Sequence, residues 1–262
     1  MGSEEQRWAL GVEYDGAHFC GWQLQDGPPT IQGALEDALA AVADRPIRLT
    51  VAGRTDAGVH ALCQVAHFDT PVVRSALAWV RGTNRFLPRA ISVRWARPVP
   101  ADFHARFSAT GRSYRYLIVN RAERPALAAG RATWIPQTLD EQRMQDAAQL
   151  LLGTHDFSAF RAAACQAKSP VRTLRRLDIE RRGDLLIVTV EANAFLHHMV
   201  RNLMGTLLFV GRGERSPEWV GEVLTSRDRR LAGTTAPPDG LYFYSVSYPS
   251  NYPIPSCSGM FP

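Results

Sequence analysis

The sequence lacks the features that mark a membrane or secreted protein. Its longest apolar stretch, residues 203–210, is interrupted by Gly205 and Thr206 and is far shorter than the roughly 20 residues that cross a bilayer. The opening residues, MGSEEQRW, contain two acids and no apolar core, so they do not resemble a secretory signal. We therefore predict a cytoplasmic protein that does not enter a membrane.

Cysteine is also scarce, and its spacing argues against two kinds of scaffold. The chain has no CxxC pair and no cluster of cysteine and histidine at zinc-binding spacing. Its four cysteines are Cys20, Cys63, Cys165 and Cys257. We expect neither a disulfide scaffold nor a metal ion.

Lysine is almost absent, although the chain is basic. Lys168 is the only lysine among 30 basic residues, which outnumber the 25 acidic ones and give a net charge of +5. Arginine forks onto phosphate and stacks on bases, so the bias fits a polyanionic partner. A GC-rich genome that replaces lysine by arginine explains the same composition, and the sequence leaves both explanations open.

Two segments concentrate the positive charge. Residues 106–131 hold six arginines and one acid, and residues 161–182 hold six arginines, Lys168 and two acids. Such runs are usually solvated strand faces. Beside aromatic residues they also suit an RNA backbone and make binding sensitive to salt.

The first half of the chain alternates strand and helix patterns. Ile31, Leu35, Leu39 and Val42 recur at helical spacing after Thr30, a capping residue. Period-two alternation and turn residues mark the strands. The expected elements are a strand at 7–14, a helix from residue 30, strands at 47–51 and 63–68, a helix at 75–87 and a strand at 91–96.

The second half repeats this order. Residues 138–141, with the sequence TLDE, form a capping box that opens a helix through residue 151. The other expected elements are strands at 113–119, 171–180 and 185–191, a helix at about 195–210, a short helix from residue 216 and a strand at 241–246. Both halves are βαββαβ, so the predicted fold class is α+β, with two ferredoxin-like halves forming one continuous mixed sheet and an active-site cleft between them.

The repeat also predicts the domain organisation. The N-terminal half spans residues 1–103 and the C-terminal half residues 104–249, with a proline- and serine-rich tail at 250–262. Pro98 and Pro100 interrupt regular structure near the join.

The strongest local motif is GRTDAGVH, at residues 53–60, directly after a predicted strand. Its two glycines allow a sharp turn and the close approach of a large substrate. Asp56 is thereby exposed at a strand end, where a carboxylate held ionised by a cation can act as nucleophile or base. An aspartate in a glycine turn can instead bond only its own backbone.

The full string resembles the signature of the tRNA pseudouridine synthase A family, and the likeness covers about residues 7–249. It rests on several strings in the same order: GVEYDGAHFCGWQLQ, VAGRTDAGVHALCQVAHFDT, FHARFSATGRSYRYLIVNR, CQAKSPVRTL, NAFLHHMVRNLMGTLLFVGRG and APPDGLYFYSVSYP. Several strings in one order are far more specific than a single motif.

The resemblance implies an isomerase, without a cofactor, that converts uridine to pseudouridine at positions 38, 39 and 40 of the tRNA anticodon stem-loop. Asp56 matches the catalytic aspartate, and Arg54 matches a residue that contacts the substrate backbone. Tyr114 matches a tyrosine that stacks on the target base, Arg201 an arginine that pairs with the catalytic carboxylate, and Leu241 an apolar residue of the uracil pocket. The resemblance also implies a homodimer with tRNA as its partner.

Each of these residues has an ordinary structural interpretation as well. Tyr114 lies in a strand, where aromatic side chains commonly pack in the core. Arg201 on an apolar helix indicates either that a buried carboxylate is its partner or that it lies on the solvent-exposed face of the helix. His197 and His198 are adjacent, and adjacent residues on a helix point about 100° apart, so we expect no metal site there.

Two other functions remain open at this point. An RNA-binding module without catalysis can use ferredoxin-like sheets and arginines, and would not need Asp56. A glycosidase usually needs two carboxylates around the scissile bond, whereas the motif offers one.

Overall fold

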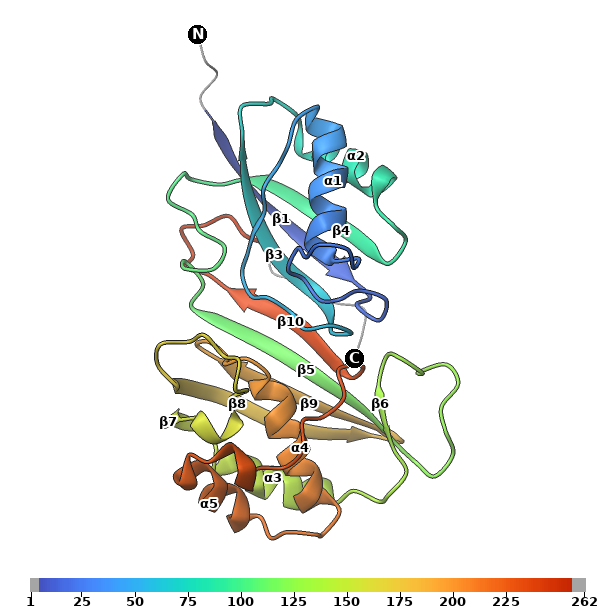
Figure 1. Ribbon diagram of the computed structural model, residues 1–262, viewed down its shortest axis with the longest axis vertical. Coiled ribbons are helices and arrows are strands. Elements are labelled where there is room, and N and C mark those ends of the chain that lie inside the picture. The colour runs from blue at the N-terminus through green and yellow to red at the C-terminus, as the bar shows by residue number, and fades with distance from the viewer. Residues whose placement is uncertain (1–4, 256–262) are drawn as a thin grey trace. The chain divides into compact units, whose positions relative to one another are not determined.

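The computed structural model describes residues 5–255. It confirms the mixed α/β class, with a large, open, mixed sheet of ten strands; the described residues also contain five α-helices (Figure 1). The chain divides into two compact units. The first contains the residues up to Thr110 and those from Phe243 onward, and the second contains Gly111–Tyr242.

The limits of these units differ from the predicted domains. The first unit extends past residue 103 to Thr110, and it takes back the chain from Phe243. Hydrogen bonds explain the second difference, because the main-chain N–H of Thr110 donates to the carbonyl of Ser247 at 2.9 Å. The Tyr248 hydroxyl also donates to the carbonyl of Ala105 at 2.7 Å. Residues 256–262 of the predicted tail lie outside the described residues.

The first unit follows the predicted βαββαβ order. Its elements are β1 (Gln6–Tyr14), α1 (Ile31–Ala43), β2 (Thr50–Val51), β3 (His60–Thr70), α2 (Ala76–Phe86) and β4 (Ile91–Pro98), with most of β10 (Leu241–Ser247). Strand β1 lies between β4 and β3 and is antiparallel to both. Strand β3 also pairs with β2 and has β10 as its other neighbour.

The apolar stripe of α1 builds the core of this unit, as its spacing predicts. Ile31, Leu35 and Leu39 are all fully buried. Thr30 caps the helix, because its hydroxyl accepts a hydrogen bond from the N–H of Gly33. Helix α2 packs against α1, and Trp79 of α2 is buried among side chains of the sheet.

The predicted strand at 47–51 is mostly wrong, since only Thr50–Val51 is a strand. The N–H of Leu49 donates to the Glu36 carboxylate at 2.9 Å instead of to a neighbouring strand. The Arg48 guanidinium lies 2.9 Å from the same carboxylate. A side chain of α1 therefore takes the place of a strand partner, which no local pattern encodes.

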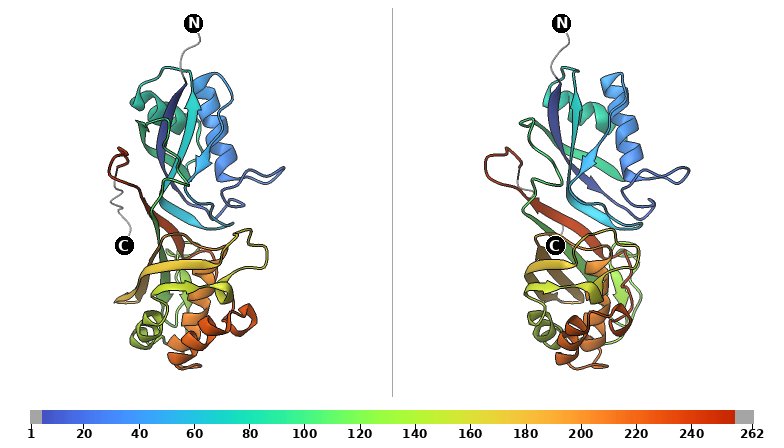
Figure 2. Two further views of the ribbon diagram at one scale, coloured as in Figure 1. Left: turned by 90° about the vertical axis from the view of Figure 1, so that its left-hand side faces the viewer. Right: turned by 60° about the vertical axis from the view of Figure 1, so that its left-hand side comes forward.

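The second unit has more elements than predicted. Its order is β5 (Gly111–Asn120), β6 (Thr133–Ile135), α3 (Glu141–Gln149), β7 (Gly153–Asp156), β8 (Val171–Arg182), β9 (Leu185–Ala192), α4 (Met199–Gly211), α5 (Glu218–Ser226) and the first residues of β10. The strand order is β5-β9-β8-β7, antiparallel throughout, and β6 pairs with β5 in parallel. Helix α3 packs against both α4 and α5 (Figure 2).

Three details of this unit correct the sequence interpretation. Strands β6 and β7 were not expected, because three or four residues carry no readable period. The helix α3 is capped by Asp140, whose carboxylate accepts from the N–H of Arg143, so the predicted capping box at Thr138 is wrong. Helix α4 begins at Met199 rather than near residue 195, because His198 has a left-handed φ of 59°.

No helix in residues 5–255 is long and apolar enough to cross a membrane. Of the described cysteines, Cys20 and Cys165 are free thiols.

Candidate active site

The GRTDAGVH motif forms a loop between β2 and β3 in the first unit. Asp56 is half-buried there, and its carbonyl accepts a hydrogen bond from the N–H of Val59 at 3.1 Å. Gly58 has a φ of 78°, a conformation that favours glycine. The motif thus makes the tight turn that its glycines predict, and Arg54 is exposed at its start.

A second loop, residues 15–22, holds this turn from one side. The N–H of Trp22 donates to the carbonyl of Thr55 at 3.0 Å, and the N–H of Gly58 donates to the carbonyl of Phe19 at 3.3 Å. A Cβ on Gly21, whose φ is 83°, would lie only 2.7 Å from the Thr55 carbonyl oxygen. The backbone of the 15–22 loop is therefore in direct contact with the backbone of the Asp56 turn, with no side chain between them.

Buried polar side chains of β1 and β3 also form hydrogen bonds with residues of the turn. The Tyr14 hydroxyl lies 2.8 Å from Oγ1 of Thr55, and Nε2 of Gln64 donates to the Gly53 carbonyl at 2.8 Å. Burial raises the pKa of Tyr14 to about 12, although its hydrogen bonds to Thr55 and Gln64 oppose that rise. Tyr14 is therefore a neutral hydroxyl at physiological pH.

The last residue of the motif, His60, is buried beside the same loop. Its Nδ1 accepts a hydrogen bond from the N–H of Gly16 at 3.1 Å, and Asp15 Oδ1 lies 3.1 Å from the same nitrogen. A Cβ on Gly16 would lie 2.0 Å from the Val59 carbonyl oxygen. Sequence reasoning did not single out Tyr14, Gln64 or His60; the DG turn and the final histidine of the motif were the signals available.

Tyr114 lies in β5 of the second unit, opposite Val190 of β9. Only 9% of it is exposed, and its ring meets that of Phe195 edge-on, with centroids 5.0 Å apart. The side chain is thus largely packed, and a rigid aromatic neighbour fixes its orientation.

Arg201 lies in α4, and Leu241 is the first residue of β10. Both belong to the second unit. The Arg201 Nε donates to the Ala236 carbonyl at 2.8 Å, and the N–H of Ala236 donates back to the Arg201 carbonyl at 3.0 Å. Leu241 is buried at the start of β10, and its N–H donates to the carbonyl of Pro238. Residues 236–241 therefore contact Arg201 at Ala236 and lead directly into Leu241, while Arg54 and Asp56 lie in one turn.

The geometric argument against a metal at His197 and His198 does not apply. Both residues precede α4 rather than lying on it, and their ring centroids are 4.0 Å apart. The expectation of a metal-free protein consequently rests on the cysteine spacing and on the family resemblance.

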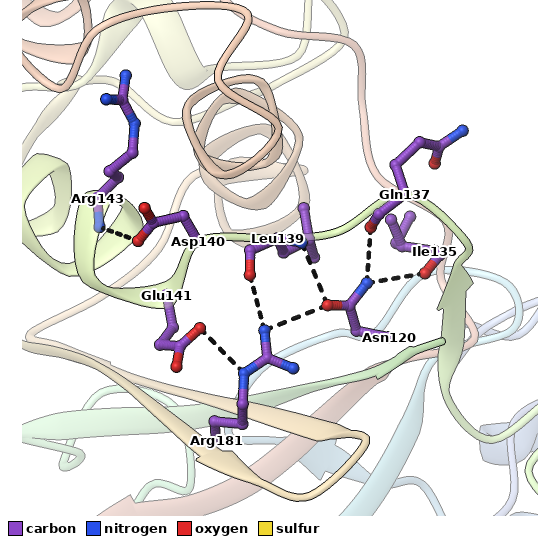
Figure 3. Close-up of polar contacts among 8 residues, drawn as sticks. All are labelled: Asn120, Ile135, Gln137, Leu139, Asp140, Glu141, Arg143 and Arg181. Atoms are coloured by element: carbon purple, nitrogen blue, oxygen red, sulfur yellow. Dashed lines mark hydrogen bonds and ion pairs between the residues drawn. The ribbon is translucent and has the colours of Figure 1, made fainter. Parts of the chain in front are cut away.

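One arginine of the basic segments has a structural role, visible in Figure 3. The Arg181 guanidinium donates to the Glu141 carboxylate at 2.9 Å, to the Leu139 carbonyl at 2.8 Å and to Asn120 Oδ1 at 3.2 Å. Asn120 in turn donates to the carbonyls of Ile135 and Gln137. Arg181 therefore ties β8 to the start of α3 and to β5, beside a surface pocket of about 420 Å³.

The chain is similar to known proteins over most of its length. A family model described as tRNA pseudouridine synthase matches residues 11–108 and 147–249. The chain is 55% identical over 251 residues to tRNA pseudouridine synthase A of Stenotrophomonas maltophilia, covering 95% of this chain and 98% of that protein. It is 55% identical over 249 residues to that of Dechloromonas aromatica, covering 95% of each.

The chain therefore belongs to the tRNA pseudouridine synthase family, and it is an isomerase. Both of these relatives are named tRNA pseudouridine synthase A, and the resemblance of the sequence to that group is confirmed.

Proposed function

We propose that this isomerase converts uridine to pseudouridine at positions 38, 39 and 40 of the tRNA anticodon stem-loop, with Asp56 as its catalytic carboxylate. The observation that carries the proposal is the turn around Asp56. Its backbone is hydrogen-bonded to residues 15–22 on one side, and Thr55 is held by a buried tyrosine on the other. Such a turn gives a carboxylate a fixed position, which catalysis requires.

The chemistry needs little besides a placed carboxylate. The bond between N1 and C1′ breaks, the uracil turns, C5 joins C1′, and the proton on C5 is lost while N1 gains one. The atoms balance with no oxidation and no net hydrolysis. Asp56 can attack C1′, attack the base, or remove the 2′ proton of the ribose, and the proposal is compatible with all three routes.

The other residues have roles that the reaction demands. The target uridine must leave a stacked stem-loop, so an aromatic face and an apolar wall are needed to hold it. We assign these to Tyr114 and Leu241. Arg201 supplies the positive charge that keeps Asp56 ionised against desolvation by the RNA. Exposed Arg54, two residues before Asp56, contacts the RNA backbone.

The proposal extends to the setting of the reaction. We propose that the protein acts on tRNA in the cytoplasm as a homodimer, with no metal ion or cofactor. The family resemblance supports these assignments, and the net charge of +5 agrees with an anionic partner.

Mapping of the product tests the proposal. The purified protein is incubated, without metal or nucleotide, with an unmodified tRNA that carries uridines at positions 38 to 40, and pseudouridine is located by chemical labelling and primer extension. A matched tRNA with cytidines at these positions is the control. Pseudouridine at 38 to 40 supports the proposal, and pseudouridine elsewhere refutes the site assignment. Free uracil indicates a glycosidase, and salt-sensitive binding without product indicates an RNA-binding module.

A further inference from the structure

The connection between a short 3-10 helix, Arg229–Leu231, and β10 crosses helix α4 with the two backbones in contact. We call residues 232–240 the α4 strap. A Cβ on Gly205 of α4 would lie 1.6 Å from the carbonyl oxygen of Thr234, and a Cβ on Gly233 would lie 2.6 Å from the carbonyl oxygen of Gly205. Glycines on both sides therefore let the strap backbone lie directly on the helix backbone.

Asn202, one residue after Arg201, is the centre of the contacts that hold the strap. It is 1% exposed. Its Oδ1 accepts from the Thr235 hydroxyl at 2.7 Å and from the Arg229 guanidinium at 3.0 Å, while its Nδ2 donates to the Phe160 carbonyl at 2.8 Å. The amide thus has a partner at both ends, which fixes its orientation.

Two further contacts from α4 fix the register of the strap. The N–H of Gly233 donates to the Thr206 hydroxyl at 3.0 Å. The N–H of Ala236 donates to the carbonyl of Arg201, whose Nε donates to the carbonyl of Ala236. Residues 201–206 of α4 therefore bind the strap at Gly233, Thr235 and Ala236.

Beyond Ala236 the strap is attached to β5. The buried Tyr116 hydroxyl donates to the Pro237 carbonyl at 2.8 Å, and the N–H of Leu117 donates to the Gly240 carbonyl at 2.8 Å. Leu241 follows immediately. A displacement of the strap along α4 would consequently shift both the partner of the Arg201 guanidinium and the position of Leu241.

We propose that Asn202 and Thr235 are positioning residues for pseudouridine formation. They clamp the α4 strap so that the Arg201 guanidinium and the Leu241 side chain keep one fixed geometry. The inference rests on the proposed function of Arg201 and Leu241. A displacement of about 1 Å in catalytic geometry can lower the rate on the order of a hundredfold. Loss of the hydrogen bonds of Asn202 and Thr235 can therefore slow the reaction substantially.

Thr235 is the better residue to change, because it is exposed whereas Asn202 is buried. An Asn202→Ala protein would lose the hydrogen bonds to Phe160, Arg229 and Thr235 at once, so loss of folding would confuse its effect. Thr235→Val replaces the hydroxyl, which also accepts from the Arg229 guanidinium at 3.2 Å, by a methyl group, and Thr235→Ser retains the hydroxyl. Thr225→Val is the matched control, since the exposed Thr225 hydroxyl bonds a carbonyl within α5.

The experiment measures single-turnover pseudouridine formation and tRNA affinity for the four proteins. We expect Thr235→Val to lower the rate at least tenfold with tRNA affinity and melting temperature unchanged. Thr235→Ser and Thr225→Val should stay within about twofold of the wild-type rate. A wild-type rate in Thr235→Val, or equal slowing in Thr235→Ser, overturns the inference.

A second measurement separates this inference from the proposed function. Amide hydrogen exchange at Gly233 and Ala236 should become faster in Thr235→Val and stay slow in Thr235→Ser, whatever the substrate. If the wild-type protein forms no pseudouridine in the anticodon stem-loop, the proposed function fails, and the exchange result still tests the clamp. Unchanged exchange in Thr235→Val overturns it.

Discussion

The hydroxyl of Tyr14 lies 2.8 Å from Oγ1 of Thr55, and both residues are buried. The contact joins the last residue of β1 to the residue just before Asp56, across 41 positions of sequence. The position of the proposed catalytic carboxylate is therefore coupled to the end of β1 and not to its own loop alone.

Removal of the Tyr14 hydroxyl tests this coupling. Tyr14→Phe leaves Thr55 without its partner, so we expect the free energy of unfolding to fall by about 1 to 2 kcal/mol and kcat to fall several-fold. Tyr248→Phe is the matched control, because it also removes a tyrosine hydroxyl bond in the same unit. Chemical denaturation and steady-state kinetics give both values. Equal loss of activity in the two variants would argue against a specific role for Tyr14.

Two glycines with left-handed backbones provide a sharper test of the Asp56 turn. Gly21 has a φ of 83° and touches the Thr55 carbonyl, whereas Gly27 has a φ of 97° and a Cβ added there would have no other group within 4 Å. Alanine at either site costs about 1 to 3 kcal/mol of backbone strain. Only Gly21→Ala should also displace the turn and lower the pseudouridine rate at least tenfold. Comparable rates in the two variants would contradict the role assigned to the contact.

The pH dependence of stability should reveal His67, a buried histidine of β3. Burial, and to a smaller extent Arg7 and His104, lowers its pKa to about 4, so it is neutral when folded. Its Nδ1 accepts from the N–H of Ala105. The unfolded chain takes up a proton near pH 6.5 while the folded protein does not, so stability falls as the pH drops from 6.5 toward 4.

His67→Gln removes this titration but keeps a side-chain acceptor. Urea denaturation at pH 7 and pH 4.5 should show a smaller pH dependence in the variant than in the wild-type protein, by about 1 to 3 kcal/mol. The pKa of His104 is also lowered, chiefly by burial, so His104 contributes a residual slope. An identical pH dependence in both proteins would show that His67 is protonated when folded.

The salt dependence of tRNA binding should identify Arg54 as a phosphate contact. Arg54→Ala should weaken binding and reduce the slope of log affinity against log salt concentration by about 1. Arg45→Ala is the control, because Arg45 is exposed in the same unit beyond the end of α1. Filter binding between low and moderate salt measures the slopes. An unchanged slope in Arg54→Ala would remove Arg54 from the proposed RNA contacts.

The fold of the first unit could be predicted because its signals are local. The period of α1 and the alternation of β1 are each carried by neighbouring residues, and the structure has both elements starting within one residue of the prediction. Strands β6 and β7 escaped prediction because short strands are specified by their partners. The helix cap at Asp140 was misplaced because two polar residues compete for that role within three positions.

The candidate site divides in the same way. Asp56 and Arg54 could be predicted because the GRTDAGVH motif contains both the glycines that form the turn and the charged side chains. Tyr14, Gln64 and Asn202 were missed because each acts through a partner far away in sequence. No period marks such a residue, and only the folded backbone shows which groups a buried hydroxyl or amide holds in place.

Replacement of Asp56 by asparagine tests the proposed catalytic role most directly. Asn has nearly the same shape but cannot ionise, so it should preserve the turn and the affinity for tRNA. The measurement is pseudouridine formed in an unmodified tRNA after long incubation with Asp56→Asn, beside the wild-type protein and with tRNA affinity determined in parallel. We predict unchanged binding and no product, whereas full activity in Asp56→Asn would contradict a catalytic role for this carboxylate.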